Sequence, residues 1–158
     1  HREFTRDVEG VELTFEFELG KAKVRGSVDR LEVDSDGRFF VVDFKTGKAI
    51  SKDDAAKNLQ LACYQLAVVL NKFEETLTAP TPSPEISGSH LVFLGHDAKD
   101  VTTRIRPPIV ASDVVEKIET IATQMSAPVF VAKKNQFCGS CPVKTSCPVH
   151  LEGRSVIG

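Results

Sequence analysis

Hydrophobic and polar residues alternate along the first part of the chain. Between residues 11 and 19, apolar side chains occupy every second position, and glutamates or a threonine stand between them. This period of two predicts a strand with one buried face and one acidic face. A less regular alternation predicts a second strand over residues 22–33, after a turn at Gly20 and Lys21.

Three further strands are predicted from the segments that follow. The pair Asp36 and Gly37 is typical of tight hairpin turns, so the second strand should turn back into a third. This third strand, residues 38–45, is more apolar than the first two, which predicts a more buried position. Residues 90–96 and 101–106 predict two later strands, the second being an edge partner of the first.

Apolar residues at spacings of three and four predict two helices, over residues 53–72 and 113–125. Ser51 and Asp54 resemble a capping box at the start of the first helix, and Ser112 is expected to cap the second. The prolines after the first helix predict a loop. Three strands, a helix, two strands and a helix together predict an α/β domain with a mixed sheet.

Composition adds limits on the class of protein. The chain has 158 residues, of which 41% are hydrophobic and 27% are charged, with a formal net charge of −2. These values predict one ordinary globular domain and argue against a generic basic protein that coats DNA. They leave room for an enzyme that meets DNA through a metal and a local basic patch. Because no apolar run approaches a membrane span and no signal peptide opens the chain, we expect a cytoplasmic protein without a membrane partner.

Three ionisable residues lie where the pattern predicts strands. Asp43 and Lys45 are two residues apart near the end of the third strand, so they share a face. Counted from the Asp-Gly turn, Asp29 lies opposite about residue 42, within one or two positions. A buried carboxylate is unfavourable unless it is paired or binds a metal. A cross-strand salt bridge would satisfy this, and so would a Mg²⁺ site whose lysine orients or deprotonates an attacking water.

The first predicted helix carries Gln60 and Tyr64, which share one face because they are four residues apart. On its own such a pair is typical of a polar helix edge. Cys63, which stands between them, is expected to be a small buried residue.

Three short motifs occur in a fixed order: G-S-V-D-R at residues 26–30, V-V-D-F-K-T-G at residues 41–47 and Q-L-A-C-Y at residues 60–64. In this order and spacing they resemble the motifs of the PD-(D/E)XK nuclease superfamily, and more narrowly of its RecB-like branch. The resemblance covers about residues 10–75. It implies a restriction-endonuclease-like α/β fold, a mixed central sheet flanked by helices. The implied activity is metal-dependent hydrolysis of DNA phosphodiester bonds, in which water attacks in line and leaves a 5′-phosphate.

The resemblance also implies roles for individual residues. Asp29 and Asp43 would be ligands of Mg²⁺ or Mn²⁺, and the backbone carbonyl of Phe44 would complete the protein's contribution. Lys45 would be the catalytic lysine. Gln60 and Tyr64 would position the DNA backbone or order the active-site helix.

The expected biological setting follows from the same resemblance. The nuclease modules of AddB-type and actinobacterial helicase–nucleases share these motifs, which implies an exonuclease in double-strand-break repair and recombination. Its partners would be DNA, an N-terminal helicase region of the same chain and a partner helicase–nuclease subunit. A stand-alone exonuclease of CRISPR adaptation carries the same motifs, and a nuclease-fold module that binds DNA without cutting it is a further alternative.

One feature of the RecB-like branch is missing from this sequence. That branch has a histidine metal ligand on a helix upstream of the first strand, and residues 1–10 are too few for such a helix. His90 and His96 lie on a later strand and do not fit the motif. We therefore expect residues 1–132 to be a nuclease core without its N-terminal helix, and residues 133–158 to be a tail of the same domain. Such a fragment is expected to bind metal weakly or to be inactive.

The predicted tail carries Cys138, Cys141 and Cys147 as C-x2-C-x5-C. Clustered cysteines without a secretion signal are typical of metal or cluster ligands in a reducing compartment. Zn²⁺ bound by these three cysteines and His150 is one possibility, and three unligated cysteines are another. The resemblance to iron–sulfur members of the family implies instead a [4Fe–4S] cluster in the full-length protein, with a fourth cysteine upstream.

Basic residues near the end of the chain are candidates for DNA contacts. Arg104 and Arg106 form a basic edge on the fifth strand, and Lys133 and Lys134 open the tail. These side chains could follow a DNA backbone, although scattered surface charges are an equally ordinary explanation.

Overall fold

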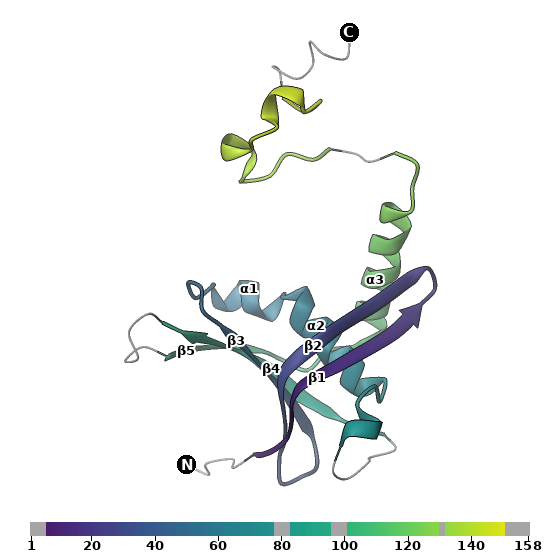
Figure 1. Cartoon of the computed structure of the whole chain (residues 1–158), viewed down its shortest axis with the longest axis vertical. Coiled ribbons are helices and arrows are strands. Elements are labelled where there is room, and N and C mark those ends of the chain that lie inside the picture. The colour runs from purple at the N-terminus through teal and green to yellow at the C-terminus, as the bar shows by residue number, and fades with distance from the viewer. Residues whose placement is uncertain (1–5, 78–82, 96–100, 130–131, 151–158) are drawn as a thin grey trace. The chain divides into compact units, whose positions relative to one another are not determined.

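A five-stranded mixed sheet lies at the centre of the N-terminal unit, residues 1–122 (Figure 1). The computed structural model describes residues 6–77, 83–95, 101–129 and 132–150. The strands lie across the sheet in sequence order: β1 (Asp7–Leu19), β2 (Ala22–Val33), β3 (Phe39–Lys45), β4 (Ile86–Leu94) and β5 (Val101–Arg106).

Neighbouring strands are antiparallel except for β3 and β4, which are parallel. Parallel strands need a crossover connection, and here it carries α1 (Lys52–Ala56), α2 (Leu59–Val69) and the short η1 (Glu74–Thr76). The mixed α/β fold predicted from the sequence is therefore confirmed.

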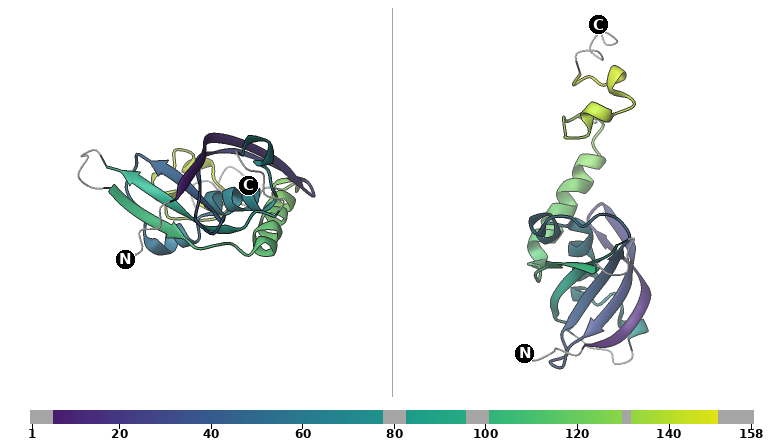
Figure 2. Two further views of the ribbon diagram at one scale, coloured as in Figure 1. Left: turned by 90° about the horizontal axis from the view of Figure 1, so that it is seen from below. Right: turned by 90° about the vertical axis from the view of Figure 1, so that its left-hand side faces the viewer.

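The core lies between the sheet and α2, as the two views of Figure 2 show. Strand residues, most of them at alternate positions, and residues on all sides of α2 supply it, and α3 (Ala111–Met125) adds Val114 and Ile118. Each large apolar side chain removed from water there contributes about 1.5–3 kcal/mol. The buried strand residues of this core are Phe15, Phe17, Val28, Leu31, Phe39, Val41, Leu91 and Phe93.

The single helix predicted over residues 53–72 is two helices in the structure. α1 ends at Ala56, and Asn58 adopts an extended conformation with φ −63° and ψ 115°. The Asn58 side chain accepts a hydrogen bond from the Leu61 amide at 3.0 Å, which caps a new helix. The apolar period runs through this break, so periodicity alone did not reveal it. The break places Gln60 in the first turn of α2.

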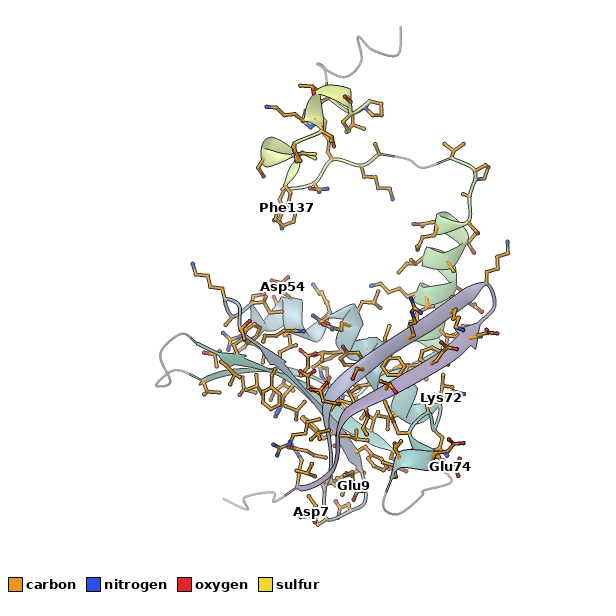
Figure 3. All side chains as sticks on the ribbon, viewed as in Figure 1. Asp7, Glu9, Asp54, Lys72, Glu74 and Phe137 are labelled. Carbon is orange, nitrogen blue, oxygen red and sulfur yellow. The ribbon has the colours of Figure 1, made fainter. Side chains whose placement is uncertain are left out.

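The capping interaction predicted at Ser51 is confirmed. The Ser51 hydroxyl accepts from the Asp54 amide at 3.0 Å and donates to the Asp54 carboxylate at 2.7 Å. This satisfies one of the free amides at the start of α1, whose Asp54 is labelled in Figure 3.

Several predicted boundaries differ from the structure, and β1, predicted to begin at residue 11, begins at Asp7. α3 starts at Ala111, so Ser112 lies within its first turn and does not cap it; the Val110 carbonyl accepts the hydrogen bonds of the first turn. β4 starts at Ile86, inside the segment predicted to be a loop, because its first residues pair with β3.

The register of β2 and β3 agrees with the predicted one within its margin. Arg30 pairs with Val42, and Leu31 pairs with Val41. One step further along this register, Asp29 would stand beside Asp43. The two carboxylates predicted to converge therefore come from neighbouring strands.

Residues 123–158 form a second unit that begins within α3, upstream of the boundary expected after residue 132. Its described elements after α3 are two short 3₁₀ turns, η2 (Cys138–Ser140) and η3 (Lys144–Ser146). No side chain is buried in the described part of this unit. In the part of the chain that the structure describes, no helix is long and apolar enough to cross a membrane.

Candidate active site

The site lies where β2 and β3 stop pairing. The last paired residue of this stretch of β2 is Arg30, and the preceding residue, Asp29, uses its side chain to reach β3. Its Oδ2 accepts a hydrogen bond from the Phe44 amide at 2.7 Å. This bond fixes the carboxylate of one strand against the backbone of the next.

Asp43 is the most constrained of the acidic residues. Only 2% of its surface is exposed, and its Oδ2 lies 2.7 Å from the Lys45 ammonium. Burial raises the pKa of Asp43; the Lys45 ammonium opposes this rise, and the charge of Asp29 adds to it.

A chain of polar contacts runs from Asp43 to α2. The Lys45 ammonium donates to Gln60 Oε1 at 3.2 Å, and Gln60 Nε2 donates to the Tyr64 hydroxyl at 2.7 Å. The contacts exist because α2 starts at Leu59 and turns Gln60 and Tyr64 toward the end of β3. Four of the five side chains predicted for the site thus form one chain of contacts, and the fifth, Asp29, is joined to β3 through the Phe44 amide.

Tyr64 is held by aromatic packing. Its ring meets Phe15 edge to face, with centroids 5.8 Å apart. Gly26 makes room for this contact, since a Cβ at that position would lie 2.9 Å from the Phe15 ring. Burial raises the pKa of Tyr64, so its hydroxyl keeps its proton at neutral pH and can donate a hydrogen bond.

The arrangement fits a hard divalent cation. Among the described residues no group of three or more histidine, cysteine or acidic side chains could hold a metal. Two carboxylates and a backbone carbonyl are nevertheless sufficient for Mg²⁺, which keeps several waters and uses few protein ligands. Asp29, Asp43 and the Phe44 carbonyl would supply such an all-oxygen set, and the buried Oδ2 of Asp43 already faces a cation, the Lys45 ammonium at 2.7 Å.

Comparison with known protein families agrees with this geometry. The family model of the PD-(D/E)XK nuclease superfamily matches residues 1–148. The chain belongs to the PD-(D/E)XK nuclease superfamily. A comparison with curated proteins finds no match. Among solved structures, the crystal structure of SSO0001 matches with 16% sequence identity and a TM-score of 0.43, covering 90% of this chain and 61% of that one.

The arginines predicted to bind DNA have structural contacts in this PD-(D/E)XK chain. Arg104 donates to the Ile50 carbonyl at 2.8 Å, and Arg106 donates to the Ala56 carbonyl. Both therefore hold the α1 segment against β5. Burial lowers the pKa of Arg106 and raises that of Cys63, which is only partly buried.

The cysteines of the tail do not form a ligand group in the structure. Cys138, Cys141 and Cys147 are free thiols, and together with His150 they make no cluster that could hold a metal. Their contacts are local: the Asn135 amide donates to the Cys138 sulfur at 3.2 Å, for example. The arrangement does not fit a bound cluster or zinc, so both remain predictions from the sequence.

Lys133 and Lys134 are exposed in the second unit. His90 pairs with Val42 on β3, where its ring packs edge to face on Phe40. His96 lies outside the described residues.

Sequence reasoning missed Gln65, which is fully buried. Its Nε2 donates to the Ser89 hydroxyl at 2.7 Å and to the Pro107 carbonyl at 3.2 Å, and its Oε1 accepts from the Ile109 amide at 3.0 Å. Gln65 therefore ties α2 to β4 and to the segment before α3. A polar residue at a position of α2 flanked by buried apolar residues was the available signal.

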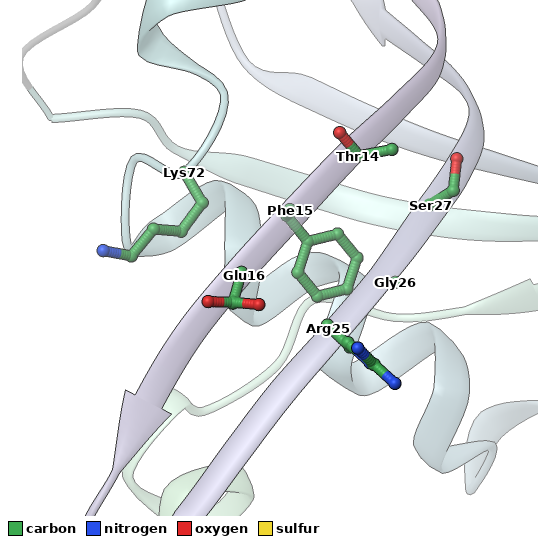
Figure 4. Close-up of a pocket in the computed structure, with 7 residues that line it drawn as sticks. All are labelled: Thr14, Phe15, Glu16, Arg25, Gly26, Ser27 and Lys72. Atoms are coloured by element: carbon green, nitrogen blue, oxygen red, sulfur yellow. The ribbon is translucent and has the colours of Figure 1, made fainter.

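A hollow of about 650 Å³ lies on the β1–β2 ribbon (Figure 4). In that view the Phe15 ring lies between the two strands, on the side of Gly26. Both signs of charge line the hollow, through Glu16, Arg25 and Lys72, and none of the five site residues does. We assign no ligand to it.

Proposed function

We propose that this chain is the catalytic part of a RecB-like DNA exonuclease that uses Mg²⁺ or Mn²⁺. Superfamily membership supports nuclease activity with DNA as the substrate. The motif order supports the RecB-like branch, and with it a helicase–nuclease that processes double-strand breaks. An exonuclease of CRISPR adaptation is the alternative that shares these motifs.

One observation carries the proposal: Lys45 contacts both the buried Asp43 carboxylate and Gln60. A plain salt bridge would need only the pair. Here Asp29 stands close enough to raise the pKa of Asp43, and two carboxylates held beside one lysine provide the charges of a cation-dependent hydrolytic site.

Each residue has a role that its contacts allow. A bound divalent cation would polarise the scissile phosphate and favour ionisation of a water. Asp29 and Asp43 would hold it, and the Phe44 amide keeps Asp29 in place. The Lys45 ammonium would orient the attacking water and stabilise the charge that develops on the phosphate oxygens. Gln60 would hold Lys45, and the Tyr64 hydroxyl would donate to the DNA backbone.

Replacement of Asp43 by asparagine tests the proposal. In the full-length protein, we expect Asp43→Asn to lower Mg²⁺-dependent cleavage of linear DNA by at least about 100-fold, the size usual for loss of a group that stabilises the transition state. Asp53→Asn is the matched control because Asp53 is an exposed carboxylate on α1. Equal cleavage by Asp43→Asn and wild type would refute the assignment.

The choice of DNA substrate tests the exonuclease part separately. An exonuclease degrades linear DNA and leaves covalently closed circular DNA intact. Cleavage of both at similar rates would indicate an endonuclease. Binding of DNA by wild type without any cleavage in Mg²⁺ or Mn²⁺ would favour the non-cleaving alternative.

A further inference from the structure

A cavity of about 340 Å³ lies beside the end of β3 and is not used by the residues assigned so far. Residues 46–49, which follow the catalytic lysine directly, form one wall of it. The rest is formed by Phe93 on β4, Gly95 just after β4 and Thr102 on β5. Its volume is in the range of small ligand sites.

The strand register places this cavity next to Lys45. Lys45 pairs with Phe93, and Phe93 pairs with Thr102. Side chains at paired positions lie on the same face of a sheet, with about 5 Å between neighbouring strands. The cavity therefore lies on the face that carries the Lys45 side chain, over β4 and β5, whereas Asp29 lies on β2.

The wall formed by residues 46–49 offers hydrogen-bond donors. The amides of Gly47, Lys48 and Ala49 donate no hydrogen bond to any described residue. The Thr46 and Thr102 hydroxyls line the same space, as does the exposed Lys48. Among the described residues that line it, none is acidic. Free amides, hydroxyls and an ammonium around one cavity are the groups that bind phosphate oxygens.

The wall is fixed at both ends, which keeps these donors in position. Lys45 is paired within the sheet, and the carbonyl of Ile50 accepts a hydrogen bond from Arg104 at 2.8 Å. Arg104 thus supports the loop from β5. A loop held in this way loses little conformational freedom when it binds.

We propose that this cavity binds the DNA phosphate next to the scissile one. Lys48 and the amides of residues 47–49 would receive the phosphate. This inference rests on the proposed function, because it places the scissile phosphate at Asp43 and Lys45. It makes Lys48 a positioning residue and assigns the loop after the catalytic lysine to the path of the substrate strand.

The salt dependence of DNA binding tests the inference without requiring cleavage. Binding of a short single-stranded oligonucleotide is measured by fluorescence anisotropy in EDTA over a range of salt concentrations. Each phosphate neutralised on single-stranded DNA contributes about 0.7 to the slope of log K against log salt. We expect Lys48→Ala to lower that slope by about 0.7 and to weaken binding several-fold at low salt.

Two further variants make the test specific. Lys117→Ala removes one exposed lysine from α3 and should leave the slope close to that of wild type. Gly47→Leu should fold normally, because a Cβ at Gly47 meets no atom within 4 Å and the backbone there is unstrained. We expect its added side chain to narrow the cavity and weaken binding.

An oligonucleotide with an uncharged methylphosphonate at one position identifies the phosphate involved. When the methylphosphonate replaces the phosphate that Lys48 contacts, Lys48→Ala should not weaken DNA binding further, because the negative charge at that position is already absent. Lys48→Ala with the affinity and slope of Lys117→Ala would overturn the inference, whether or not the chain cleaves DNA. Absence of cleavage by wild type, with the Lys48 effect intact, would refute the proposed activity and leave the phosphate site standing.

Discussion

At the scale of single residues, Asp43 illustrates how a carboxylate is accommodated on the most apolar strand. Burial raises its pKa, and the Lys45 ammonium at 2.7 Å counteracts part of that rise. The same face therefore carries a buried carboxylate and its cation. A hydrophobic replacement would be easier to bury, so the charge is better explained by chemistry than by stability.

His90 provides a pH-dependent prediction at this scale. Burial lowers its pKa from 6.5, and Arg6 lowers it further, whereas Glu32 raises it. The folded state thus favours the neutral ring, so its stabilising contribution is present above pH 6.5 and is lost as the pH falls through the folded pKa. We expect the free energy of unfolding of wild type to fall more steeply than that of His90→Gln as the pH falls below about 6.5. Urea denaturation between pH 5 and pH 8 checks this, and parallel profiles of the two proteins would contradict it.

At the scale of elements, the break between α1 and α2 determines where the site's helical residues lie. Asn58 separates α1 from α2 and caps α2, and it lies two residues before Gln60. A continuous helix from residue 53 would present Gln60 in a different direction, since each residue advances a helix by a fixed rotation. The Asn58 cap, a local backbone feature, therefore helps to direct Gln60 toward Lys45.

Removal of this cap is the prediction for the element. We expect Asn58→Ala to lower the free energy of unfolding by about 0.5–2 kcal/mol, because the Leu61 amide loses its acceptor. We also expect a lower rate of cleavage, because α2 then holds Gln60 less firmly. Lys57→Ala, one residue earlier and exposed, should change neither quantity appreciably in denaturation and cleavage assays.

At the scale of the whole molecule, the two units differ in how they are built. The core residues of the first unit all lie between residues 13 and 118. The described part of the second unit buries no side chain and consists of short turns. Stability should therefore be concentrated in the sheet and the helices that cover it.

Truncation tests this division. We expect a chain that ends at residue 132 to keep the free energy of unfolding of the full chain within about 1 kcal/mol, because residues 133–150, the described part of the removed segment, bury no side chain. Chemical denaturation followed by circular dichroism measures the difference. A larger loss would mean that the cysteine tail stabilises the first unit, as a bound cluster or zinc would.

Much of the fold could be predicted because its causes are local. Alternation along β1 and the Asp-Gly turn after β2 are visible over a few residues; they predicted these strands and, to within a position or two, the register of β2 and β3. The helix break could not be read from periodicity, since Asn58 occurs inside an unbroken apolar pattern. Arg104 and Arg106 were read as a basic edge, because a sequence does not reveal which carbonyls a side chain will reach.

The sequence by itself determined the strands, the motif residues and membership of the superfamily. Only the tertiary structure brought Asp29 onto the Phe44 amide and Lys45 between Asp43 and Gln60. It also placed the free amides after Lys45 around one cavity with Phe93 and Thr102. The physical reason is the same in each case: these contacts join segments distant in the chain, and their geometry depends on how α2 and the strands pack together.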